Sequence, residues 1–117
     1  MKIIGFAVFV ASVSGVSMAQ TAPAGDAARG EKAFVHHLCH TCHGTVGQGG
    51  ERGAGPKIAP GVWPYPAFAQ QVRKPRLVMI PYSEKTLPEQ ELADMHVYLQ
   101  SVKNPPQAKD VPLLKDF

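Results

Sequence analysis

Two cysteines and a histidine stand close together in the first half of the chain, as Cys39, Cys42 and His43. Their order is C-x-x-C-H, the pattern of covalent c-type haem attachment. In such a site the two thiols add across the haem vinyl groups as thioethers, and the histidine binds the iron. Both sulfurs and the imidazole then reach one macrocycle from a single turn of backbone. The motif therefore predicts one covalently bound haem c, with His43 as the proximal axial ligand.

The cysteine count limits the other uses of these thiols. The chain has 2 cysteines, so none is left over for a separate disulfide or for a zinc site with four Cys and His ligands. Two other interpretations stay open, a thioredoxin-like dithiol and a partial metal knuckle. A redox dithiol needs no histidine after it, and a zinc site needs a second pair of ligands.

The first residues have the pattern of a secretory signal. Lys2 gives a short positive segment, residues 3–16 are apolar, and residues 17–19 offer small side chains for cleavage. We predict a cleaved signal peptide over residues 1–19 and export to the periplasm. The apolar stretch is too short for a membrane span, so we expect no stable membrane insertion. An uncleaved anchor is the alternative.

Composition limits the fold and the partners. The formal net charge of +3 comes without a concentrated basic face, which argues against nucleic-acid binding. The 11 prolines and 11 glycines indicate long loops between few helices, and no segment alternates long enough for a strand. We predict an all-α domain over residues 26–103, with a flexible leader at 20–25 and a proline-containing tail at 104–117. The tail would pack on its own domain or on a partner, and we expect the first.

Helix signals position the motif. Asp26 can cap a helix over residues 27–37 that leads into the cysteines. Prolines 64 and 66 introduce a short helix over residues 67–73, because proline is tolerated in a first turn. The segments between and after these helices are expected to be loops, at residues 44–60 and 76–85.

The last helix is predicted from its start signal and its apolar period. Thr86 and Glu89 have the spacing of a capping box, which would open a helix that ends near residue 102. Its apolar residues recur at steps of three and four, so they share one face. That face carries Leu92, Met95, Leu99 and Val102.

The opposite side of the iron needs a second ligand or stays vacant, which decides between an electron carrier and a catalyst. Met79 lies on a proline-flanked loop, far enough from His43 for the chain to wrap around the haem. We expect Met79 as the distal axial ligand. Met95 belongs to the apolar face of the last helix and is expected in the core. The remaining rivals are expected to be surface, loop or half-exposed residues: His36, His37, His40 and His96.

The chain resembles the small class I c-type cytochromes of bacteria over nearly its whole domain. The residues that carry the likeness are Gly30, Phe34, Cys39, Cys42, His43, Gly44, Gly55, Pro56, Met79, Pro81, Tyr82, Leu92, Tyr98 and Leu99. One position departs from the family pattern. A proline usually follows the ligand methionine directly, and here that position is Ile80.

The resemblance implies a fold of three to four helices wrapped around one covalent haem, with His43 and Met79 as axial ligands. Gly30 would let the first and last helices approach closely. The carbonyl of Pro56 would accept a hydrogen bond from Nδ1 of His43 and fix the ring. The aromatic pair across the helix crossing would be Phe34 and Tyr98.

Other side chains could line the haem or meet a partner. Three aromatic residues are candidates for the haem crevice or a propionate, with ordinary core packing as the alternative: Trp63, Tyr65 and Tyr82. A basic run precedes Met79, and it is either a solvated face or a surface that steers an acidic partner. It consists of Arg73, Lys74 and Arg76.

An iron with histidine and methionine ligands has no open position, so we predict an electron carrier and not an enzyme. It would be the electron acceptor or cytochrome subunit of a periplasmic dehydrogenase, similar to flavocytochromes of the p-cresol methylhydroxylase and eugenol hydroxylase type. Downstream partners would be a cytochrome, a copper protein or an oxidase. One alternative is a free shuttle to a terminal oxidase. Another is a five-coordinate haem peroxidase or gas-binding protein.

Overall fold

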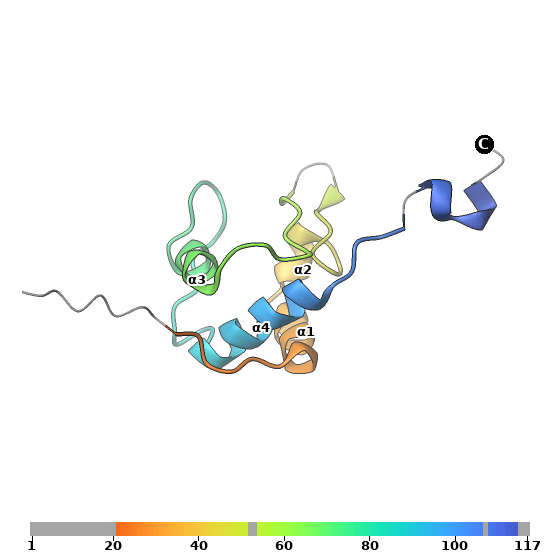
Figure 1. The fold of residues 1–117 in the computed structure, drawn as a ribbon. Coiled ribbons are helices and arrows are strands. Elements are labelled where there is room, and N and C mark those ends of the chain that lie inside the picture. Colours follow the sequence, from red (N-terminus) through yellow and green to blue (C-terminus); the bar gives the residue numbers. More distant parts are fainter. Residues whose placement is uncertain (1–20, 52–53, 107, 115–117) are drawn as a thin grey trace, which may run out of the picture.

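The computed structural model describes residues 21–51, 54–106 and 108–114. No strand occurs among them, so the prediction of an all-α fold is confirmed (Figure 1). The predicted signal peptide lies outside the described residues. None of the described helices combines the length and hydrophobicity needed to cross a membrane. The helical elements are α1 (Ala27–His36), α2 (Cys39–His43), α3 (Tyr65–Arg73), α4 (Glu89–Ser101) and the short 3₁₀ turns η2 (Ala108–Asp110) and η3 (Pro112–Leu114).

The crossing of α1 and α4 forms the centre of the domain (Figure 1). Asp26 caps α1 as predicted, because its side chain accepts a hydrogen bond from the amide of Arg29. A Cβ on Gly30 would lie 2.0 Å from the carbonyl oxygen of Asp94, so only glycine allows this approach. The rings of Phe34 and Tyr98 lie 5.7 Å apart across the crossing. Both expectations for this contact are confirmed.

A buried carboxylate joins the two helices beside that crossing. The Asp94 side chain is 2% exposed and accepts hydrogen bonds from Nε and Nη2 of Arg29 at 2.7 and 2.8 Å. It also accepts one from the amide of Asp26 at 2.7 Å. The guanidinium of Arg29 holds the pKa of Asp94 below its usual range, since it favours the ionised form.

The start of α4 differs from the capping-box prediction. The helix begins at Glu89 with Pro88 as its N-cap, and no side chain caps it. Thr86 instead belongs to the preceding turn, where its amide donates to the backbone and side-chain oxygens of Ser83. The prediction failed because Ser83 offered Thr86 a local partner, while Pro88 already provided an extended residue before the helix. The apolar face is as predicted, with Leu92, Met95 and Leu99 buried.

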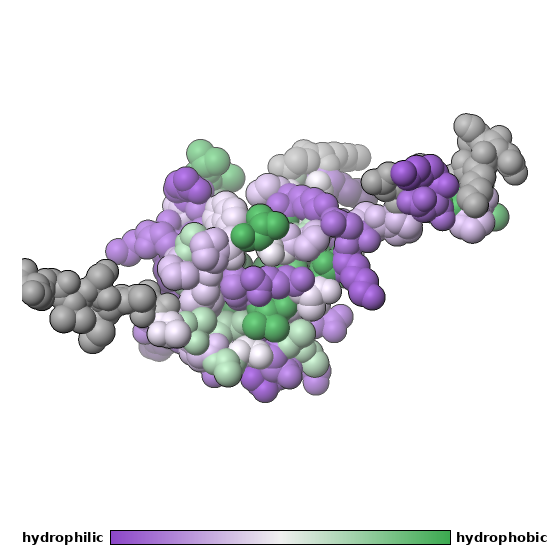
Figure 2. All heavy atoms as spheres, in the orientation of Figure 1, coloured by the Kyte–Doolittle hydropathy of each residue, from purple (hydrophilic) through white to green (hydrophobic). Residues whose placement is uncertain are grey.

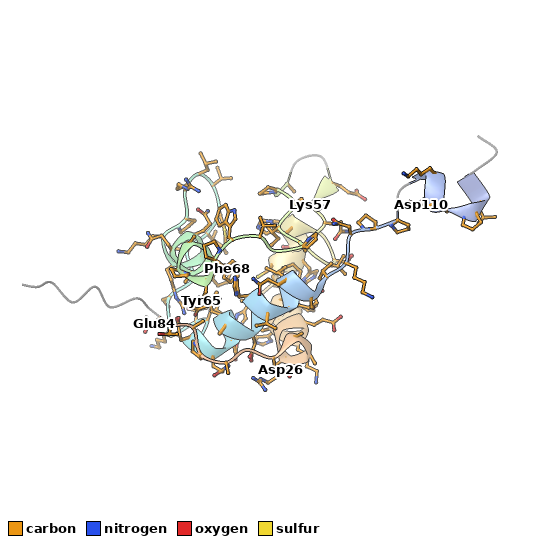
Figure 3. The ribbon with its side chains drawn as sticks, in the orientation of Figure 1. Asp26, Lys57, Tyr65, Phe68, Glu84 and Asp110 are labelled. Carbon is orange, nitrogen blue, oxygen red and sulfur yellow. The ribbon has the colours of Figure 1, made fainter. Side chains whose placement is uncertain are left out.

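Helix α3 begins two residues earlier than predicted. Tyr65 opens it, and Pro66 lies in its first turn, where a missing N–H costs nothing. Its buried face is made of Tyr65, Ala69 and Val72. Figure 3 shows Tyr65 and Phe68 on the side of α3 that faces α4, where both rings contact His96 at centroid distances of 5.5 and 5.3 Å.

The described residues of the predicted leader follow α4 (Figure 1). Ala22 packs against the core, and the carbonyl of Ala24 accepts a hydrogen bond from Gln90 at 2.8 Å. A Cβ on Gly25 would lie 2.6 Å from the carbonyl oxygen of Ala93. Contrary to the expectation of a flexible leader, this segment is bound to the surface of α4.

The described residues of the tail, 104–106 and 108–114, run away from the helices, against our expectation that the tail packs on the domain (Figure 1). Asn104 contacts Lys57 at 3.3 Å, and beyond it Leu113 is 85% exposed. Helix α4 already ends at Ser101, and the prolines that follow Asn104 keep the chain from resuming a helix there.

Candidate haem site

A single left-handed residue connects α1 to the cysteine motif. Leu38 has φ 60°, and directly after it the five residues of α2 carry both cysteines and His43. The amide and hydroxyl of Thr41 both donate to the carbonyl of Leu38, at 3.1 and 2.7 Å, which closes this turn. Cys39 is half-buried and Cys42 is exposed, and neither is in a disulfide. The motif residues therefore lie together on one turn of helix.

The ring of His43 has a defined tautomer. Its Nδ1 lies 2.9 Å from the carbonyl oxygen of Pro56, as the resemblance led us to expect. A carbonyl can only accept, so Nδ1 carries the proton and donates it. Nε2 then keeps its lone pair, and no described residue forms a hydrogen bond with it. This is the state in which an imidazole binds a metal, oriented by its other nitrogen.

Two glycines allow the loop that carries Pro56 to approach α2. A Cβ on Gly50 or Gly55 would lie 2.1 or 2.6 Å from the carbonyl oxygen of Cys42. The amide of Gly50 donates to the carbonyl of Gly55 at 3.0 Å, so the loop closes on itself at this point. The close contact places the carbonyl of Pro56 beside His43. Sequence reasoning found Pro56 only through the resemblance, because the contact is not local.

Met79 lies on a loop whose tip is apolar and exposed. Its own side chain is partly buried against the core, and Cys39 packs against the same core. On either side of it Leu77, Val78 and Ile80 are 97%, 96% and 65% exposed. Figure 2 shows this hydrophobic group at the tip of the loop after α3. The structure thus connects Met79 to the cysteine motif through the core that both contact.

Three of the rival ligands are packed or hydrogen-bonded elsewhere, while Nδ1 of His40 is buried without a hydrogen-bond partner among the described residues. Met95 is 2% exposed in the core, and Nε2 of His96 lies 2.8 Å from the carbonyl oxygen of Trp63. His37 lies in the turn directly after α1, within the expectation of a surface or loop residue, although its ring is held against the fold. Its side chain is 8% exposed, and its Nε2 lies 2.6 Å from a carboxylate oxygen of Glu91 on α4.

The three candidate aromatic residues have different partners. The hydroxyl of Tyr65 donates to Glu89, and the hydroxyl of Tyr82 donates to the carbonyl of His37 at 2.8 Å. Burial is the main cause that raises the pKa of both phenols, so both keep their protons at neutral pH. Trp63 has no hydroxyl, and it is 44% exposed. It remains the candidate for the haem edge.

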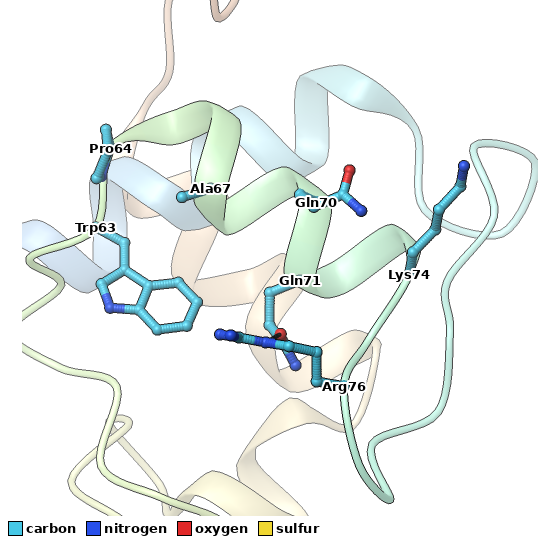
Figure 4. Close-up of a pocket in the computed structure, with 7 residues that line it drawn as sticks. All are labelled: Trp63, Pro64, Ala67, Gln70, Gln71, Lys74 and Arg76. Carbon is cyan, nitrogen blue, oxygen red and sulfur yellow. Dashed lines mark hydrogen bonds between the residues drawn. The ribbon is translucent and has the colours of Figure 1, made fainter.

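A pocket of about 370 Å³ lies beside α3, where Trp63 and the basic run meet (Figure 4). The guanidinium of Arg76 lies 6.0 Å from the centre of the Trp63 ring, and its Nε donates to Gln71 at 3.3 Å. Lys74 also lines the pocket. Arg73 does not belong to this surface, because its guanidinium binds backbone carbonyls inside the fold.

The environment of the cysteines does not fit a redox dithiol. Burial raises the pKa of the Cys39 thiol to about 11, so it stays protonated at neutral pH. Thiol–disulfide enzymes instead lower the pKa of their attacking cysteine. A zinc knuckle would need four ligands. Among the described residues no group of three or more His, Cys, Asp or Glu side chains could hold a metal ion.

The donor set fits a haem. An imidazole whose Nδ1 donates to a carbonyl, a thioether and two thiols at the attachment spacing are together the ligands and tethers that such a group needs. Large apolar side chains next to these donors in the sequence are also exposed to solvent. Leu38, directly before the motif, is 60% exposed, and Val78, directly before Met79, is 96% exposed. A macrocycle held between the motif and the Met79 loop would provide an apolar surface for such side chains.

Comparison with known proteins gives one match. Residues 25–99 match the family model described as cytochrome C oxidase, cbb3-type, subunit III. The matched range contains the cysteine motif, Pro56 and Met79, and it ends within α4. No curated protein and no solved structure matches the chain.

Proposed function

Because the chain belongs to the family of cytochrome c oxidase, cbb3-type, subunit III, and is a c-type electron-transfer haem protein, we propose that it carries single electrons in the periplasm on one covalent haem. Cys39 and Cys42 would hold the porphyrin, and His43 would bind the iron through Nε2. The observation that supports this assignment best is the hydrogen bond from Nδ1 of His43 to Pro56, which leaves Nε2 free. When bound, the haem supplies the one-electron redox chemistry.

Met79 completes the site as the distal ligand. Its thioether is soft, and this favours the ferrous over the ferric state relative to a second histidine. With both axial positions taken, the chain offers no place for a substrate on the iron. Its own residues then orient the cofactor and exclude water, and the protein passes electrons without activating small molecules.

We propose that the physiological donor is a periplasmic dehydrogenase of the flavin type, which this chain serves as electron acceptor or cytochrome subunit. A downstream cytochrome, copper protein or oxidase would take the electron onward. The second candidate is a free shuttle to a terminal oxidase. Purification from the native cell separates the two, because a subunit copurifies with a flavoprotein at constant stoichiometry, while a shuttle elutes alone.

The loop that carries Met79 is suited to contact such a redox partner. Its exposed tip, Leu77 and Val78, lies next to the cations Lys74 and Arg76 in the sequence, and all four side chains are exposed. Small interfaces are typical of redox encounters. Association with an acidic partner should then weaken as salt rises, and exchange of Lys74 and Arg76 for glutamine should reduce this salt dependence.

A Met79→Ala variant of the holoprotein tests the site. We expect loss of the methionine–iron charge-transfer band, a lower reduction potential and binding of carbon monoxide to the ferrous protein. Met95→Leu is the matched control, because it replaces a methionine in the core and should leave all three unchanged. An unchanged spectrum in Met79→Ala would remove Met79 from the site. Carbon monoxide binding to the unaltered protein would favour the five-coordinate alternative.

A further inference from the structure

Tyr82 is held by two elements that are far apart in the sequence. Its amide donates to the carbonyl of Val72 on α3 at 3.0 Å. Its hydroxyl donates to the carbonyl of His37, directly after α1, at 2.8 Å. The ring of His37 also meets the ring of Tyr82 edge-on at 6.2 Å. Tyr82 therefore joins the end of the Met79 loop to the segment that enters the cysteine motif.

Arg73 secures the same residue from a third direction. Its Nη1 donates to the carbonyls of Tyr82 and Leu87 at 3.2 and 2.6 Å, and its Nη2 lies 3.0 Å from Glu89. The guanidinium side chain is 17% exposed, so these bonds are largely shielded from water. Together with the Val72 contact, this closes the base of the loop at residues 72–73 and 82.

The tip of the loop has few attachments of its own. Leu77 and Val78 are almost fully exposed, and Ile80 stands where the resemblance would place a stiffening proline. Arg76 is fixed by Gln71 on one side of the tip, and Tyr82 is the next strongly bound residue on the other. Apart from the packing of Met79 itself against the core, its position between them therefore depends on how firmly Tyr82 is held.

We propose that Tyr82 is a positioning residue for the Met79 ligand, and that its hydroxyl bond to His37 sets how readily Met79 leaves the iron. The proposal rests on the proposed function, since it requires Met79 to be a ligand. His37 is two residues before Cys39 and is itself fixed by Glu91 on α4. One hydroxyl thus couples the distal loop to the backbone that carries the proximal ligand.

The test is a Tyr82→Phe variant of the holoprotein, titrated with imidazole as a competing iron ligand. The ring and its packing stay, and only the bond to His37 is lost. Loss of one buried hydrogen bond should lower the apparent dissociation constant of imidazole about fivefold. The methionine charge-transfer band should remain in the absence of imidazole. Tyr98→Phe is the matched control, because it removes a phenol hydroxyl at the crossing of α1 and α4, away from the loop, and should leave imidazole binding unchanged.

Two further results keep the outcomes separate. If Tyr82→Phe binds imidazole like the unaltered protein while Met79→Ala loses the charge-transfer band, the positioning role is wrong and the ligand assignment stands. If Met79→Ala changes nothing, the proposed site itself fails. Equal effects of Tyr98→Phe and Tyr82→Phe would also overturn the proposal, because general loosening would then explain both. Arg73→Gln removes the hydrogen bond to the carbonyl of Tyr82, and it should also lower the apparent dissociation constant of imidazole.

Discussion

The two halves of this domain are held together in different ways. At the crossing of α1 and α4, backbones touch at Gly30, aromatic rings pack, and Asp94 is buried with its partners. The Met79 loop has almost no packing at its tip and is held at its base by hydrogen bonds of Tyr82 and Arg73. A rigid frame is thus combined with a loop whose ligand is held by a few polar contacts. Substitutions in the frame should change stability, and those in the loop should change the site.

The largest effect is expected at Gly30. A Gly30→Val variant puts a Cβ against the backbone of Asp94, which cannot rotate away, so α1 and α4 must separate. We expect a loss of about 3 kcal/mol in the free energy of unfolding, measured by urea denaturation. Ala28→Val, on the exposed side of the same helix, is the control and should lose far less. Equal losses would show that the crossing is looser than described.

The second-largest loss of stability is expected for Asp94→Asn. The asparagine amide has the shape of the carboxylate but lacks the charge that pairs with Arg29. We expect the free energy of unfolding to fall by about 2 kcal/mol. Because the folded chain lowers the pKa of Asp94, this stabilisation is complete above the unfolded-state pKa of about 4 and is lost as pH falls through the folded-state pKa. The gap in stability between the two proteins should therefore close in acid. A gap that stays constant from pH 7 to pH 2 contradicts the assignment.

A smaller effect is expected at Glu89, in the polar contacts beside the loop. Tyr65 and Arg73 both donate to this carboxylate and lower its pKa, with the Tyr65 bond as the larger cause. Since the side chain is 46% exposed, water screens the pair, and Glu89→Gln should cost less than about 1 kcal/mol. The difference should fade as pH falls and Glu89 protonates. Thermal unfolding of both proteins at neutral and acid pH measures it.

The smallest effect is expected at the loop tip, where the substitution should raise the stability of the protein and not lower it. Leu77 has φ 66° and is 97% exposed, so its side chain gains nothing from packing while its backbone is strained. Asparagine tolerates this conformation better, and Leu77→Asn should stabilise the protein by about 0.5 kcal/mol. Denaturant midpoints are sufficient to detect this. A loss of stability would mean that the Leu77 side chain is covered in the holoprotein.

The sequence predicted the parts that depend on local pattern. The apolar face of α4 followed from its period, and the Asp26 cap followed from its position before α1. Two side chains could not be placed from the sequence, because their partners come from other segments of the chain. His37 is buried because Glu91 lies 54 positions away on α4, and Arg73 is internal because the carbonyls of Tyr82 and Leu87 return to it. The capping-box prediction at Thr86 failed for a local reason, because the amide of Thr86 donates to Ser83.

The left-handed turn at Leu38 has a consequence for binding. With one residue between the frame and the motif, the thiols and the imidazole are already placed by the crossing of α1 and α4. The cysteine motif therefore loses little further conformational entropy when the haem binds, because folding of the two helices has already ordered it. Most of the remaining loss of conformational entropy then falls on the Met79 loop, which must become ordered for its methionine to bind the iron.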